Sequence, residues 1–229
     1  MSFGPSTSTP RHSDARTVPT EPVTTERAQR TYAGRPIADR LAERRRRFLD
    51  AALDEFASTG YAASSVTSIC RAAGLSRRQF YELFSDREEL LIAVYDEIQG
   101  AARDAVASAL AQSPSQEVRD LSNAAMSAYM QSVGTDPRRA EVSFVQVVGV
   151  SPRVEQHRLE GRDDWADYFV AAMSTFAGRP EDARGRQLGI AFVGALTAVV
   201  HRWSLAPEPD ALDTVVDVLT DILLAFAEI

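Results

Sequence analysis

The sequence predicts an all-α protein of nine helices, three of them in an N-terminal head and six in a C-terminal domain. Two observations predict this class. First, apolar residues recur at helical spacing in each segment that lies between clusters of Gly, Pro and Ser. Second, no stretch bounded by turn residues shows the sustained alternation of apolar and polar residues that is typical of a β-strand. With 229 residues, of which 45% are hydrophobic, the chain is long enough to bury a substantial core.

Residues 1–36 are predicted to form a flexible tail ahead of a head at 37–86 and a C-terminal domain at 87–229. The tail is rich in Ser, Thr, Pro and Arg and has almost no large apolar residues. Such a segment cannot bury enough surface to offset the entropy lost on ordering. An alternative interpretation is a basic arm that lies in a DNA minor groove. The contacts of that arm would be Arg27, Arg30 and Arg35.

The first predicted helix covers Ile37 to Ser58 and ends before Gly60. Its apolar face consists of Leu41, Phe48, Leu49, Ala52, Leu53 and Phe56. Four consecutive cations, Arg44 to Arg47, are spread around the whole helix, so they cannot all contact one surface. One or two of them, with Arg44 as the candidate, are predicted to contact a DNA backbone, because the next two helices have the pattern of a DNA-binding unit.

Two short helices follow between Ser65 and Phe84 and meet at Gly74. The apolar face of the first consists of Val66, Ile69, Cys70 and Ala73. Ser65 is its predicted N-cap, and Gly74 can adopt the left-handed conformation that ends a helix. Ser76 and Gln79 have the spacing of a capping box, which starts the second helix at once. The apolar face of the second consists of Phe80, Leu83 and Phe84.

A helix, a tight Gly turn and a second short helix with a cationic start form a helix-turn-helix, which reads DNA. The second helix of such a unit enters the major groove by its N-terminal end. The residues predicted to read bases or grip phosphate are Arg77, Arg78, Gln79 and Tyr81. The residues predicted to fix the register through contacts to the DNA backbone are Ser65, Thr67 and Arg87.

The stretch from Phe48 to Leu91 resembles the DNA-binding head of the TetR family of bacterial transcriptional regulators. The matching positions are Ala51-Ala52 with Phe56, Gly60-Tyr61, Ser65-Val66, Ile69, Ala73-Gly74-Leu75-Ser76, Phe80-Tyr81, Phe84 and Arg87-Glu88-Glu89-Leu90. Three positions differ from the family pattern. Cys70 stands where the family usually has Ala, and Arg87 stands where it usually has Lys. Leu83 stands where an aromatic residue or His is common. The resemblance implies a nine-helix TetR-like fold, a homodimer, double-stranded operator DNA and a small-molecule effector.

The fourth predicted helix is a rod from Arg87 to Gln112. At about 1.5 Å per residue it would span about 37 Å. Ser85 and Asp86 can each cap it, because each has a Glu three residues further on. In the family the position of Arg87 meets the DNA backbone, so this rod would join a phosphate contact to the C-terminal domain.

Five further helices are predicted, and the last two have the features of a dimer interface. The five cover residues 117–133, 137–148, 153–177, 182–204 and 209–227. The last carries a wide apolar stripe, and the one before it carries small residues that permit close approach. The predicted interface residues are Gly194, Ala198, Leu212, Val215, Val216, Leu219, Ile222, Leu223 and Phe226. A two-fold dimer would place its recognition helices about 34 Å apart. The alternative is a monomer whose own core uses both helices.

Aromatic, Met and Val residues on the middle helices are candidates for a ligand pocket. They are Met126, Tyr129, Met130, Phe144, Val148, Trp165, Tyr168, Phe169, Met173 and Phe176. Such residues at helical spacing also occur in ordinary cores, which is the alternative for each of them. Trp165 and Tyr168 carry polar groups that a dry core rarely needs. The predicted effector is therefore small and largely apolar.

Composition and motifs exclude several other classes of protein. The chain has no phosphate loop, dinucleotide fingerprint, nucleophile elbow or zinc-protease motif. Three His and one Cys leave few parts for a metal or catalytic site, so neither an enzyme nor a cofactor is expected. No apolar run reaches the ~20 residues that span a bilayer, which favours a cytoplasmic protein without membrane contact. The net charge of −7 arises after residue 86, where 22 acidic residues outnumber 12 Arg, so the head is not repelled by phosphate.

These observations predict a TetR-like transcriptional repressor. It would bind a near-palindromic operator as a homodimer and leave it when an effector tilts the rod. One alternative is an all-α ligand- or protein-binding module whose head contacts a protein. The other is a transcriptional activator of the same family.

Overall fold

The computed structural model of the protein describes residue 1, residues 31–32 and residues 35–228. The chain divides into two compact units, residues 1–37 and residues 38–229.

The first unit contains a short hairpin. Strand β1 (Thr31–Tyr32) pairs antiparallel with strand β2 (Arg35–Pro36). The sequence predicted no strand, so this two-residue ladder is an addition to the all-α class, which is otherwise confirmed for the described residues. Arg27 and Arg30 of the predicted tail lie outside the described residues, as does the side chain of Arg35.

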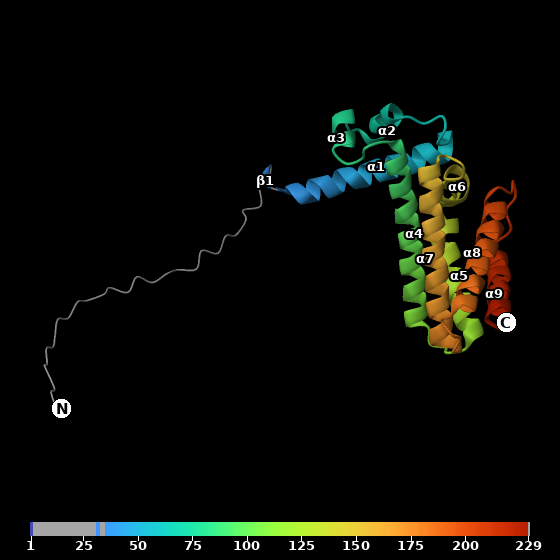
Figure 1. Ribbon diagram of the computed structural model, residues 1–229. Helices are drawn as coiled ribbons and strands as arrows, with labels where there is room; N and C mark the ends of the chain where they lie inside the picture. Colours follow the sequence, from blue (N-terminus) through green and yellow to red (C-terminus); the bar gives the residue numbers. More distant parts are fainter. Residues whose placement is uncertain (2–30, 33–34, 229) are drawn as a thin grey trace. The chain divides into compact units, whose positions relative to one another are not determined.

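The head consists of helices α1 (Ile37–Thr59), α2 (Val66–Ala73) and α3 (Arg77–Tyr81) (Figure 1). Gly74 ends α2 with a φ of 62°, as its position predicted. The capping box that starts α3 is also formed: Ser76 Oγ accepts from Gln79 N at 3.3 Å, and Gln79 Oε1 accepts from Ser76 N at 2.9 Å. The recognition helix ends at Tyr81, earlier than the predicted Phe84.

Aromatic side chains form the core of the head. The rings of Phe48 and Phe80 meet edge to face with centroids 5.5 Å apart, and Phe84 lies 6.2 Å from Phe48. All three are almost fully buried, together with Phe56 and Ile69. A core of this size holds the short helices α2 and α3 at a fixed angle, although neither would be stable alone.

The C-terminal domain is a bundle of long helices that α4 connects to the head (Figure 1). Its elements are α4 (Arg87–Gln112), α5 (Val118–Gly134), α6 (Pro137–Glu141), the π-helical turn η1 (Val142–Gln146), α7 (Pro152–Ala177), α8 (Ala183–Ser204) and α9 (Leu212–Glu228). The helix predicted at 137–148 is thus split into α6 and η1, and α9 begins three residues later than predicted. Asp86 is the N-cap of α4, since it accepts from Glu89 N at 2.7 Å.

Glycine permits a close contact between two helices of the bundle. α7 packs along α8, and a Cβ on Gly189 of α8 would lie 2.8 Å from the carbonyl oxygen of Ala166 on α7. The small residues of α8 were predicted to accommodate a second subunit. At Gly189 the close neighbour belongs to the same chain.

The apolar stripe of α9 also faces the core of its own chain. Val215, Val216, Leu219 and Leu223 are buried, and α9 packs mainly on α5 and α8. These four predicted interface residues are therefore covered by the core of their own chain, and the dimer interface itself stays a prediction. Leu212, Ile222 and Phe226 of the same stripe are partly buried against that core.

Within the described part of the chain, none of the helices has both the length and the apolar character that crossing a bilayer requires.

Candidate DNA-binding head and ligand cavity

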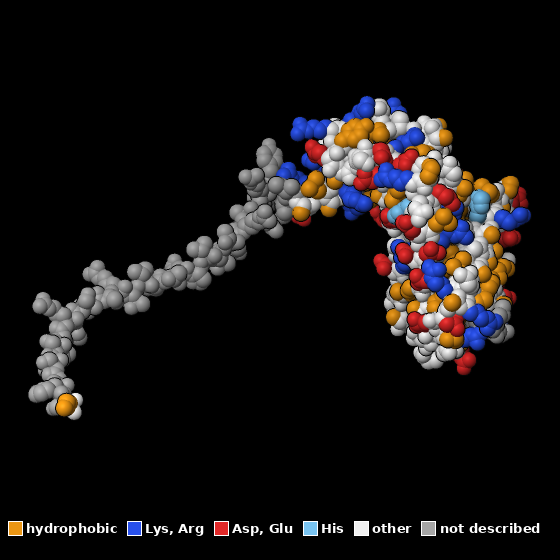
Figure 2. All heavy atoms as spheres, viewed as in Figure 1, with side chains coloured by type: hydrophobic (Ala, Val, Ile, Leu, Met, Phe, Trp, Pro, Cys, Tyr) orange, Lys and Arg blue, Asp and Glu red, His pale blue; other side chains and the backbone are white. Residues whose placement is uncertain are grey.

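The outer surface of α3 carries three exposed side chains that the sequence predicted for DNA contact. The Arg78 side chain is 89% exposed, and its only ion pair among the described residues is a 3.4 Å contact with Glu82. Arg77 is exposed and lies over the ring of Tyr81, which is itself 52% exposed. Figure 2 shows basic side chains on the outer surface of the head. The N-terminal turn of α3 therefore presents two guanidinium groups and a phenol to solvent.

Two of the other predicted contacts around this turn are also capping residues. Ser65 Oγ accepts from Ser68 N at 3.0 Å at the start of α2, and Thr67 is exposed in the first turn of that helix. Gln79 uses its side-chain oxygen to cap α3, so only its amide nitrogen remains free to donate. The structure brings Ser65, Thr67 and Gln79 together with α3 in one compact head.

Two of the four cations on α1 bond to residues of the helix-turn-helix. Arg47 Nη2 donates to the carbonyl oxygen of Ala73 at 2.6 Å, and it would lie 2.9 Å from a Cβ at Gly74. Arg44 pairs with Glu82 at 3.4 Å and remains 30% exposed. Arg47 therefore fixes the turn, whereas Arg44 is still able to exchange its partner for a phosphate.

Arg87, which was predicted to contact the DNA backbone, has partners within its own chain. Its guanidinium donates to the carbonyl oxygens of Tyr61 and Ser64 and lies 4.1 Å above the Tyr61 ring. Burial raises the pKa of Tyr61, although the Arg87 charge opposes the shift. Arg87 thus attaches the start of α4 to the α1–α2 connection, and the sequence could not show this because both partners are backbone carbonyls.

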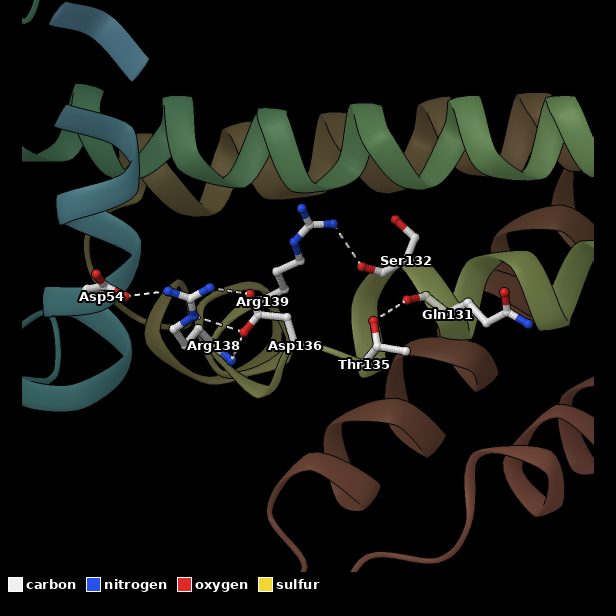
Figure 3. Close-up of polar contacts among 7 residues, drawn as sticks. All are labelled: Asp54, Gln131, Ser132, Thr135, Asp136, Arg138 and Arg139. Atoms are coloured by element: carbon white, nitrogen blue, oxygen red, sulfur yellow. Dashed lines mark hydrogen bonds and ion pairs between the residues drawn. The ribbon is translucent and has the colours of Figure 1, made fainter. Parts of the chain in front are cut away.

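The segment α6–η1 connects the bundle to the head. Arg138 joins Asp54 on α1 to Asp136 at the start of α6, as Figure 3 shows, and it lowers the pKa of Asp136. Gln146 at the end of η1 accepts from the backbone N of Tyr61 at 2.8 Å. A displacement of η1 would therefore reach the same connection that Arg87 holds.

A cavity of about 80 Å³ lies between α4, α5, α7, α8 and η1. Eight of the ten predicted pocket residues line it. They are Met126, Tyr129, Phe144, Trp165, Tyr168, Phe169, Met173 and Phe176. The rings of Tyr129, Trp165 and Tyr168 meet edge to face along one wall.

Two predicted pocket residues lie elsewhere. Met130 is fully buried on another face of α5, where its Cε would lie 3.4 Å from a Cβ on Gly134. Val148 is 49% exposed after the π-turn. The extra residue in a π-turn rotates the following side chains, so Phe144 faces the cavity and Val148 does not.

The sequence did not predict the polar residues that line the cavity. Arg158 and Arg162 line the cavity from α7, and Gln99 lines it from α4, where its Oε1 accepts from Trp165 Nε1 at 2.9 Å. Positions 158, 162, 165 and 169 share one face of a helix, so the spacing could have placed both Arg beside Trp165.

Two phenols complete this lining and remain neutral. Burial raises the pKa of Tyr95 to about 12, and burial also raises the pKa of Tyr129 strongly. Both hydroxyls are therefore protonated at neutral pH and can donate a hydrogen bond.

The outer faces of α8 and α9 carry exposed apolar side chains. Ile190 and Ala198 are exposed on α8, and Val218 is 45% exposed on α9. Gly194, which was predicted for the interface, lies beside the Arg162 guanidinium, 3.8 Å from its Nη2 to a Cβ at Gly194. Of the predicted interface residues, Ala198 is the one with an exposed side chain.

The sequence of the head matches a known family. Residues 48–94 match the family described as bacterial regulatory proteins, tetR family. Over these residues the chain is similar to the TetR family. TetR-family regulators bind DNA and are not enzymes, which confirms the predicted non-enzymatic class. A comparison with curated proteins found none that matches.

Solved structures share the fold over most of this chain. The fatty acid degradation regulator FadR from Bacillus halodurans superposes with a TM-score of 0.69 at 20% identity, over 79% of this chain and 94% of that one. FadR from Bacillus subtilis in complex with stearoyl-CoA has a TM-score of 0.66 at 17% identity, with coverage of 79% and 97%. A TetR-like regulator from Rhodococcus sp. RHA1 has a TM-score of 0.61 at 22% identity, with coverage of 80% and 94%. At these identities the likeness establishes the fold, which the sequence had predicted.

Proposed function

We propose that this protein is a TetR-family repressor that binds a near-palindromic operator as a homodimer in the cytoplasm. The observation that carries the proposal is the outward face of α3, where Arg77, Arg78 and Tyr81 are exposed on a rigidly capped helix. A recognition helix of five residues can reach base edges only with its first turn, and this is the turn that holds both arginines.

The dimer contact is proposed for the outer faces of α8 and α9. The inward stripe of α9 is occupied by the chain's own core, so a second subunit has to use Ile190, Ala198 and Val218. A two-fold axis through this face would pair the same patch from both chains. It would also hold the two heads at one fixed separation, as a palindromic operator requires.

The cavity is proposed to bind the effector, and η1 to transmit its effect. FadR from Bacillus subtilis was solved with stearoyl-CoA, and the lining of the present cavity is mainly apolar and aromatic. Phe144 lines the cavity and Gln146 of the same turn bonds to Tyr61 N in the head. An effector that displaces η1 would shift α4 and the head with it. A full switch from 99:1 to 1:99 requires about 5.5 kcal/mol of differential affinity.

Selection of bound duplexes from a random pool, followed by salt titration, tests the DNA-binding proposal. The logarithm of affinity should fall linearly with the logarithm of salt concentration. Arg78→Ala should weaken binding by about 1–3 kcal/mol, roughly fivefold to 150-fold. Arg119→Ala removes an exposed charge from α5 and serves as the control, with no change expected. Failure to select any duplex, together with salt-independent binding of a protein partner, would favour the alternative of a protein-contact module.

A further inference from the structure

The cavity contains two buried hydroxyl groups without partners. Ser122 is 3% exposed and Ser143 is 4% exposed, and both line the cavity. Neither Oγ has a hydrogen-bond partner among the described residues. Buried polar groups in native proteins are almost always hydrogen-bonded, and leaving one unpaired costs about 1–3 kcal/mol. These hydroxyls therefore indicate a ligand that can accept or donate a hydrogen bond.

The two cavity arginines differ in their partners. Arg158 donates two hydrogen bonds to Glu155, at 2.6 and 3.1 Å, so its charge is already compensated. Arg162 is partly buried and makes no hydrogen bond or ion pair within the described residues. Its charge interacts with Glu155, but that carboxylate is bonded to Arg158. None of the described residues that line the cavity is acidic. A partly buried cation with no carboxylate of its own favours a negatively charged ligand group.

On α4 and α7 the lining is polarised along the helix axes, and Ser122 adds a hydroxyl from the first half of α5. α4 and α7 both start at the head, because Arg153 pairs with Asp86 at 2.9 Å and Ser151 Oγ donates to Glu88 at 2.9 Å. The two helices run side by side in Figure 1. The polar lining residues of both helices lie in the parts closer to the head, and the apolar lining residues lie further from it. The polar set is Tyr95, Gln99, Arg158 and Arg162, and the apolar set includes Val106, Leu110, Phe169, Met173 and Phe176.

The length of this gradient indicates an elongated ligand. From Arg162 to Phe176 the lining of α7 extends about 21 Å, at about 1.5 Å per residue. The present volume of about 80 Å³ is smaller than an extended molecule of that length needs, so the walls have to separate when it binds. Met173 and Phe176 are side chains that can repack without breaking a polar contact.

We propose that the effector is an elongated amphipathic anion. Its carboxylate or phosphate pairs with Arg162 at the head-proximal end, its apolar chain follows α7 towards Phe176, and Ser143 bonds to a polar group next to the charge. This assignment rests on the proposed role of the cavity as the effector site. A fatty-acid carboxylate and the phosphates of an acyl thioester share this chemistry.

Binding of matched twelve-carbon probes to the full chain tests the charge assignment. The probes are laurate, methyl laurate, dodecyltrimethylammonium and lauroyl-CoA, each titrated by calorimetry below its micellar concentration. Wild type should bind laurate or lauroyl-CoA at least tenfold more tightly than methyl laurate, because a charged hydrogen bond contributes about 1.5–3 kcal/mol. The tighter of the two anions identifies the source of the anionic group. Dodecyltrimethylammonium should bind least.

Variants assign this preference to Arg162. Arg162→Gln should bring the ratio of anion to ester affinity to within about twofold, while the affinity for methyl laurate stays the same. Arg162→Lys should retain part of the ratio. Arg186→Gln is the matched control, because Arg186 is exposed, pairs with Asp167 and does not line the cavity. It should leave the ratio unchanged.

Three outcomes would overturn the assignment. They are equal affinity of wild type for the ester and the anions, an unchanged ratio in Arg162→Gln, and no binding of any probe. The DNA selection with ligand-free protein is independent of all three. If duplexes are selected but the anion preference is absent, this inference fails alone. If the preference is present but no duplex is selected, the proposed regulatory function fails alone.

Discussion

At the scale of single residues, partners decide what each arginine does. Arg78, Arg87 and Arg162 have similar surroundings in the sequence, because each lies near the apolar residues of its own helix. In the structure Arg78 is solvated, Arg87 binds two backbone carbonyls, and Arg162 lines a cavity that has no acidic side chain among its described lining residues. The sequence analysis predicted DNA contacts for both Arg78 and Arg87 and did not include Arg162. A long-range bond to backbone carbonyls, such as that of Arg87, leaves no local signal, whereas the helical spacing of Arg162 and Trp165 was a signal that could have been used.

Arg87→Ala is expected to destabilise the fold as well as weaken DNA binding. The substitution removes the donor for the carbonyls of Tyr61 and Ser64, and leaving such groups unpaired costs about 1–3 kcal/mol. Urea unfolding measures this loss. Arg78→Ala is the control, since a change at an exposed site should alter stability by less than about 0.5 kcal/mol. Wild-type stability of Arg87→Ala with lost DNA affinity would restore the originally predicted phosphate contact.

Ser143→Ala and Ser122→Ala are expected to leave the ligand-free protein as stable as wild type, or more stable. Each substitution removes a buried hydroxyl that has no partner among the described residues, and the desolvation penalty of about 1–3 kcal/mol disappears with it. Thermal unfolding without ligand provides the measurement. Ser76→Ala is the comparison, because Ser76 caps α3 and loss of an N-cap costs about 1 kcal/mol. A clear loss of stability in Ser143→Ala would mean that its hydroxyl is already satisfied.

At the scale of helices, replacing a glycine by alanine should have opposite effects on stability, depending on which atoms surround it. Gly189→Ala on α8 should destabilise the protein, because the new Cβ would lie 2.8 Å from the backbone oxygen of Ala166. Gly100→Ala on α4 should stabilise it by up to about 1 kcal/mol, because no atom lies within 4 Å of the new Cβ. Denaturant midpoints of the two variants compare them directly. Equal shifts of the same sign would contradict the close α7–α8 contact.

The sequence predicted helix boundaries better than helix partners. Gly74 and Ser76 determine the head turn through local chemistry, so both capping predictions are confirmed. The π-turn η1 has no local signature and depends on how α6 packs. The stripe of α9 showed that one face is buried, but periodicity cannot tell whether α5 of the same chain or another subunit covers it. For the same reason the pocket prediction included Met130, which is buried on another face of α5.

At the scale of the whole molecule, the contacts between cavity and head converge on one connection. Tyr61 receives its contacts from Arg87 at the start of α4 and from Gln146 at the end of η1. Both elements line the cavity further along, through Tyr95 on α4 and Ser143 on η1. An anionic group bound at the head-proximal end would therefore act within a short distance of this connection. In the proposed mechanism, the signal that releases DNA would therefore pass through the head-proximal end of the cavity, while Met173 and Phe176 repack around the apolar chain at the other end.

The assembly of two such molecules gives the last prediction. Val218→Asp places a carboxylate on the exposed face of α9, and a two-fold axis would bring both copies into the same interface. Unpaired charges at the centre of an interface are strongly unfavourable, so the variant should sediment as a monomer at micromolar concentration. Leu159→Asp, at another exposed apolar position on α7 that is 45% exposed, should remain a dimer.

Loss of the dimer should also weaken operator binding, because two linked heads gain roughly 10²–10⁴ in avidity over one. Both effects should appear in Val218→Asp while its helical circular dichroism stays at the wild-type level, since Val218 is 45% exposed and contributes little to the core. A Val218→Asp variant that remains dimeric and binds duplex normally would show that the two-fold contact uses a surface other than the outer faces of α8 and α9.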